Sequence, residues 1–174
     1  MSFLNIQLIG LTGRHHPALF GIETTRDVQR LKPHIKMLSG DYLTYSRIAL
    51  DNKGVGDPSC RICRTSQSVP LVPPDTVQHI LTECRGTAEV RERLFPELLN
   101  LLLSVEPNHA FFSSLNEFCG NNLAQFLLDC TSFNLPEHIR ISHDNPRLAD
   151  IYRFSRDFCY AIHSCRMTKL KLLS

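Results

Sequence analysis

The chain has 174 residues, of which 43% are hydrophobic and 21% are charged, a composition typical of a globular protein and not of a disordered one. Its formal net charge is only +2, so the overall charge does not by itself indicate a nucleic-acid partner. No apolar run is long enough to cross a bilayer, and the segment Met1–Leu11 lacks the basic region and cleavage site of a signal peptide. We therefore expect an intracellular protein, in the nucleus or the cytoplasm, with no membrane partner.

The hydrophobic pattern predicts a mainly helical protein that begins with an irregular segment at residues 1–21. A helix capped by a threonine is expected over residues 24–39, with a kink at Pro33 and an end at Gly40. A second, short helix is expected to begin at Asp41 and to run to about residue 50.

A short helix is expected after Asp75-Thr76, and a longer one is expected to begin at a cap at Thr87 and to be interrupted at Pro96. Two more helices are expected, one over residues 121–129 and one from Pro146 to about residue 172. Residues 131–145 are expected to connect the last two helices. The predicted fold is a small helical domain at residues 22–106, organised around a zinc knuckle, with a helical extension at 107–174 that packs on it.

Four residues predict the knuckle: Cys60, Cys63, His79 and Cys84. Two cysteines separated by two residues can place both sulfurs on one metal ion from a single tight turn, and a histidine and a cysteine at the end of a following helix can complete a tetrahedron. Zn²⁺ favours such Cys3His sites. Because all four positions are filled by protein, the site is expected to be structural and not catalytic. The alternative is a set of buried thiols and a core histidine.

The remaining cysteines are Cys119, Cys130, Cys159 and Cys165. Without a secretion signal they are expected to be reduced core thiols and not disulfides. The pair His15 and His16 is a weak accessory metal candidate. The cysteines and histidines outside the knuckle show no spacing that indicates a nucleophile beside a base, so no enzymatic activity and no small-molecule substrate are expected.

Basic side chains suggest a nucleic-acid surface with two parts. Arg61, Arg64 and Arg85 border the knuckle. The last helix adds Arg153, Arg156, Arg166 and Lys169. Positioned Lys and Arg side chains suffice to hold phosphates, and neighbouring aromatic side chains suit unpaired bases of single-stranded RNA or DNA. The alternative is a docked helix with a solvated basic face.

Most of the chain after about Gly21 resembles the zinc-binding region near the C-terminus of non-LTR (LINE-type) retrotransposon polyproteins, downstream of the reverse transcriptase. The segments that carry the resemblance are HIKMLSGDYLTY (His34–Tyr45), SCRIC (Ser59–Cys63), TVQHILTEC (Thr76–Cys84), EVRERLFPEL (Glu89–Leu98), QFLLDCTSFNLPEHIRI (Gln125–Ile141) and NPRLADIYRFSRDFCYAIHS (Asn145–Ser164). The resemblance places the family's zinc ligands on the same four knuckle residues.

Two departures from this pattern are a longer loop at 68–74 and Phe158 where relatives tend to carry Trp. The aspartate pair of a reverse transcriptase does not occur, so the resemblance implies a fragment without the catalytic domains. It implies a zinc-stabilised nucleic-acid-binding module; the alternative is a structural or protein-interaction domain, or a retroelement remnant without function.

Overall fold

The computed structural model of the chain describes residues 19, 22–65, 71–105, 119, 122–130 and 147–173. Three predicted features lie outside the described residues. They are the rest of the N-terminal segment, including His15 and His16, the loop 66–70, and the connector 131–145. No helix in the described ranges combines the length and the apolar character needed to cross a bilayer.

The prediction of a mainly helical fold is confirmed. The helical elements are α2 (Thr25–Ser39), α3 (Tyr45–Asp51), α4 (Arg61–Arg64), the π-helical turn η2 (His79–Glu83), the 3₁₀ turn η3 (Arg85–Thr87), α5 (Ala88–Val105), α7 (Leu123–Leu128) and α8 (Leu148–Lys171). Between these elements, the extended pairing found in the described ranges is a single antiparallel bridge that joins Ser59 to Pro74.

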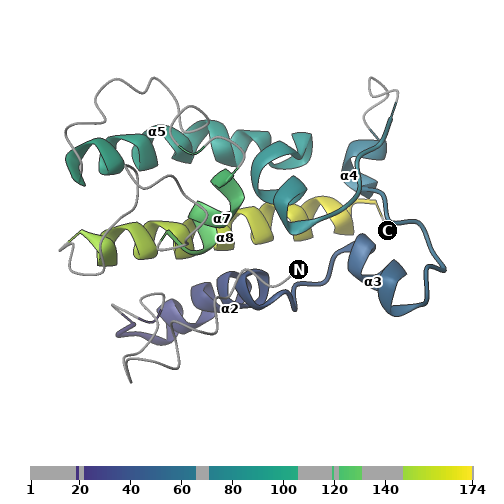
Figure 1. The fold of residues 1–174 in the computed structure, drawn as a ribbon, viewed down its shortest axis with the longest axis horizontal. Coiled ribbons are helices and arrows are strands. Elements are labelled where there is room, and N and C mark those ends of the chain that lie inside the picture. The colour runs from purple at the N-terminus through teal and green to yellow at the C-terminus, as the bar shows by residue number, and fades with distance from the viewer. Residues whose placement is uncertain are drawn as a thin grey trace.

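Helix α8 is the central element of the fold. It packs along α2 on one side and α5 on the other, and its C-terminal half also contacts α4, η2 and η3 (Figure 1). The main hydrophobic core contains buried side chains from α2, η2, α5, α7 and α8, among them Leu38, Leu98, Phe126, Phe158 and Ile162. This one core therefore draws residues from both sides of the expected boundary at residue 107.

The ends of α2 lie where the sequence predicts them. Thr24 and Asp27 form a reciprocal capping box, in which the Asp27 amide donates to Thr24 Oγ1 at 3.2 Å and the Thr24 amide donates to Asp27 Oδ2 at 3.0 Å. Gly40 ends the helix with a φ of 83°, a left-handed conformation that glycine adopts at little cost. The helix continues through Pro33, which is buried.

Three details of the predicted elements are wrong. Helix α3 begins at Tyr45 and not at Asp41, because Thr44 Oγ1 caps it by accepting from the Arg47 amide at 3.1 Å. Helix α5 is not interrupted at Pro96. Proline has no N–H to donate to the carbonyl four residues earlier, but Pro96 is exposed, so water can hydrogen-bond to that carbonyl instead. Thr87 does not cap α5 with its side chain, because its hydroxyl donates to the carbonyls of Ile80 and Cys84 at 2.9 and 3.1 Å.

Candidate metal centre

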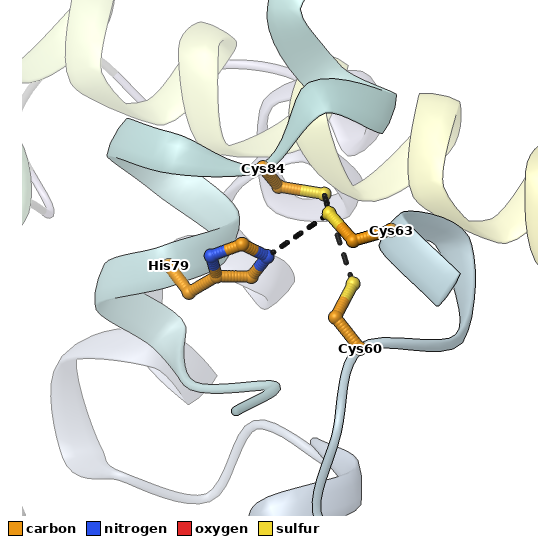
Figure 2. A group of neighbouring side chains, drawn as sticks. All are labelled: Cys60, Cys63, His79 and Cys84. Carbon is orange, nitrogen blue, oxygen red and sulfur yellow. Dashed lines mark hydrogen bonds between the residues drawn. The ribbon is translucent and has the colours of Figure 1, made fainter. Parts of the chain in front are cut away.

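The four predicted ligands converge at one end of the molecule. One ligand atom from each of Cys60, Cys63, His79 and Cys84 lies within 4.8 Å of the other three, and all four side chains are buried (Figure 2). Cys84 Sγ lies 3.8 Å from Cys60 Sγ and 3.7 Å from Cys63 Sγ, and Cys63 Sγ lies 3.4 Å from His79 Nε2. The sulfurs are too far apart for a disulfide, whose S–S bond is about 2.05 Å, and close enough to share one metal ion.

The first two ligands come from a tight turn that the chain holds in place from both sides. Cys60 precedes α4 and Cys63 lies within it, and the Arg64 amide donates to the Cys60 carbonyl at 3.0 Å. The Cys60 amide donates to the carbonyl of Pro73 at 2.9 Å, next to the Ser59–Pro74 bridge. The segment that carries the first ligand pair is therefore fixed against the segment that leads to the second pair.

The second two ligands come from the π-helical turn η2. Thr76 Oγ1 accepts from the His79 amide at 3.1 Å and so caps the helical turn at its start. The Cys84 amide then donates to the carbonyl of His79, five residues earlier, at 2.7 Å. Residues five apart on an α-helix point about 140° away from each other. The wider π turn reduces that angle, so the imidazole and the thiol face the same point.

Gly86 allows the two ligand-bearing segments to approach each other closely. A Cβ atom on Gly86 would lie 2.1 Å from Ile62 Cγ2 and 3.2 Å from Ile62 Cβ, inside the turn of α4. It would also lie 3.6 Å from Cys84 Sγ. A side chain at this position would push η3 away from α4, and with it Cys84 away from Cys63.

Groups around the ligands orient the imidazole and donate hydrogen bonds to two of the sulfurs. His79 Nδ1 lies 3.4 Å from Glu83 Oε2, so Nε2 is the nitrogen that faces the sulfurs, and the carboxylate can hold a proton on Nδ1. Backbone hydrogen bonds from Arg85 to Cys63 and from Gly86 to Cys84 favour the thiolate forms. Glu83 was not among the predicted site residues, although its spacing of four residues from His79 on a helix was a usable signal.

The thiols do not ionise independently. The hydrogen bond with Cys84, together with burial, raises the pKa of Cys60 to about 12, while the same bond lowers the pKa of Cys84. Burial raises the pKa of Cys63 as well. The protein environment by itself thus opposes three neighbouring thiolates, and a cation at their centre is what would stabilise them.

A buried ion pair connects the metal centre to α8. Both oxygens of Asp75 accept from the guanidinium of Arg166 at 2.8 Å, and Asp75 Oδ2 also accepts from the Tyr45 amide at 2.7 Å. Asp75 is 0% exposed and Arg166 is 3% exposed. Asp75 was predicted only as part of a helix start, whereas in the structure it joins α3, the segment before η2, and α8.

Two of the seven basic residues predicted to contact nucleic acid lie in the interior. Arg166 pairs with Asp75, and Arg156, which is 2% exposed, lies with its Nη2 3.6 Å from Asp27 Oδ1 in α2. Both side chains hold α8 to its neighbours and cannot contact a phosphate outside the protein. Arg156 and Arg166 therefore do not lie at the surface, where the predicted contact with nucleic acid requires them to be.

The other five basic residues reach the surface, but not at one place. Arg61, Arg64 and Arg85 are exposed beside the ligands, and Lys169 is half-exposed near them at the end of α8. Arg153 is exposed on the N-terminal half of α8, where its Nη1 lies 3.7 Å from Asp150 Oδ1.

Comparisons of the chain with protein-family models, with curated proteins and with solved structures found no match. The arrangement of the four ligands and of the side chains around them is thus the basis for the function proposed below.

Proposed function

We propose that the four ligands hold one zinc ion and that this ion has a structural role. Two sulfurs that each lie ~2.3 Å from a tetrahedral zinc are separated by about 3.8 Å, and a sulfur and a nitrogen by about 3.5 Å. The Sγ–Sγ distances of 3.7 and 3.8 Å and the Sγ–Nε2 distance of 3.4 Å agree with these edges. This agreement is the observation that carries the proposal.

A structural role follows from the number and the origin of the ligands. Four protein ligands would occupy all four coordination positions of a tetrahedral zinc ion, so no position would remain for water or substrate. The ligands come from two segments, α4 with its preceding residue and η2 with its following residue, which are otherwise joined by a short bridge and a few contacts. Zinc would link them covalently, and its binding free energy would add to the free energy of folding.

Metal analysis of the purified protein tests this proposal. We expect one zinc per chain, and we expect chelation to lower the melting temperature. A chelator-treated sample reloaded with Zn²⁺ should recover the original melting temperature. Protein that carries no metal and melts at the same temperature before and after chelation would contradict the proposal.

We further propose that the end of the molecule around the zinc centre binds single-stranded nucleic acid. The supporting observation is that two basic segments meet there. Leu170 of α8 packs against the cluster of Cys60, Ile62, Cys63 and Cys84, and Figure 1 shows the C-terminal end of α8 beside α4. Lys169 and Lys171 adjoin Leu170 in the sequence, so they bring positive charge to the same end as the arginines of α4. The resemblance to the zinc-binding region of LINE-type polyproteins supports the same function.

Binding of this kind is expected to be electrostatic, with a dissociation constant of roughly 10⁻⁴–10⁻⁶ M at physiological salt that weakens as salt rises. Titration of labelled single strands at low salt measures it, and the double variant Arg61→Ala, Arg64→Ala should bind more weakly with its zinc content unchanged. If the wild-type chain shows no binding at about 100 μM protein, the module is structural or binds proteins instead.

We propose no catalytic activity for the chain. A zinc ion held by all four protein ligands would have no position left for an activated water, and an assay for template-dependent nucleotide incorporation by the isolated chain should give no product. Incorporation above a heat-denatured control would contradict this proposal.

A further inference from the structure

A pocket next to the zinc centre combines apolar and basic walls. It lies between α3, the turn after α3, and α4, and it encloses about 230 Å³. Ile48, Ala49 and Val55 form its apolar part, and Arg61 and Arg64 bring two guanidinium groups to it. The carboxylate of Asp57, which pairs with Arg64, also lines it. A pocket with this combination suits a ligand that is flat and apolar on one part and anionic on another.

Arg61 is held at the pocket by an aromatic ring. Its guanidinium carbon lies 4.7 Å above the centroid of the Tyr45 ring, and both residues line the pocket. Tyr45 is itself fixed at the start of α3, where its amide donates to the buried Asp75. A guanidinium that is held over one ring by a cation–π contact can present its other side to a second planar group.

Arg64 has donors left for an anion. Its two contacts within the described residues, with Asp57 Oδ2 and with Ser59 Oγ, both use Nη2. A guanidinium carries five N–H donors, so either Nη1 or Nε can donate a single hydrogen bond to a phosphate while Nη2 keeps its partners. The side chain is 50% exposed, which leaves it within reach of a ligand in solution.

We infer that this pocket takes one unpaired nucleotide of a single strand, with its base stacked on the Arg61 guanidinium beside the apolar wall and its phosphate on Arg64. The inference rests on the proposed nucleic-acid binding and assigns it to one site. Duplex ends and grooves fit less well, because a paired base must leave its stack to lie in this pocket.

Titration of a labelled single-stranded oligonucleotide of about eight nucleotides tests the site. Arg61→Lys keeps the charge but removes the stacking plane, and since stacking of one base is worth ~1–3 kcal/mol, affinity should fall by about 5- to 150-fold. The matched control is Arg47→Gln, which removes a charge from the exposed ion pair with Asp51 on α3, outside the pocket, and should weaken binding less. Zinc content and circular dichroism establish that each variant is folded.

Cross-linking with a thiouridine-containing strand gives an independent readout. A cross-linked peptide from residues 45–64 would support the pocket. Three results would overturn it: equal affinity of Arg61→Lys and the wild type, an equal loss in Arg47→Gln, or cross-links confined to α8. In those cases nucleic-acid binding itself would stand, whereas an absence of binding by the wild type would overturn both proposals.

Discussion

Replacing Gly86 with alanine tests the close approach on which the metal centre depends. The new Cβ would overlap Ile62 Cγ2, 2.1 Å away, and no flexible side-chain end lies there to move aside. Overpacking of this kind costs about 1–3 kcal/mol, which in a chain of this size lowers the melting temperature by about 2–12 °C. Gly86 does not have a positive φ, so without the overlap the same substitution would be neutral or stabilising by ~0.4–1 kcal/mol. A loss of stability would therefore support the described overlap, whereas no change or a gain in stability would argue against it.

Urea denaturation of the zinc-loaded protein measures the effect, and a double-mutant cycle identifies its origin. Ile62→Ala alone should destabilise by leaving a cavity, because Ile62 is 8% exposed. In the double variant Gly86→Ala, Ile62→Ala the overlapping methyl group is gone, so the alanine at position 86 should cost less than it does in the wild-type background. A Gly86→Ala variant as stable as the wild type, with full zinc content, would refute the described packing of η3 against α4.

Three further substitutions or titrations probe the centre and its connection to the core. Cys63→Ser should abolish zinc binding and lower the free energy of unfolding more than Cys130→Ser does, as metal analysis and urea denaturation will show. Asp75→Asn should destabilise the protein by ~3–5 kcal/mol, because it leaves the buried Arg166 without its counter-charge; a loss below 1 kcal/mol would mean that the pair is solvated. Burial raises the pKa of Tyr42 from about 10 to about 12, so the stability from its neutral phenol should be complete below pH 10 and be lost as the pH rises through 12. Absorbance titration of the tyrosines should resolve this late step.

Local signals in the sequence were sufficient for the helices whose ends are set by their own residues. The capping box at Thr24 and the left-handed Gly40 both act within one turn of α2, and the structure has them as predicted. The C-x2-C pair and the His79–Cys84 spacing likewise depend on short-range geometry, and the four side chains meet.

Features that depend on distant residues could not be read in this way. Arg166 looks like any other basic residue of α8 until Asp75, 91 positions earlier, is found beside it. The same holds for Arg156 and Asp27, and the helical pattern alone gave no reason to separate these buried arginines from Arg153. The π turn was also missed, because a single inserted residue changes the helical period too briefly to leave a pattern in five residues.

The central position of α8 has a consequence for the order of folding. During synthesis the four metal ligands, which span residues 60–84, leave the ribosome well before α8, which spans Leu148–Lys171. The centre can form from local contacts at that stage, whereas α2 and α5 still expose the faces that α8 will cover. Metal binding would then hold Asp75 in place until Arg166 arrives, and a chain that stops before residue 148 would keep an uncovered apolar surface and be prone to aggregation.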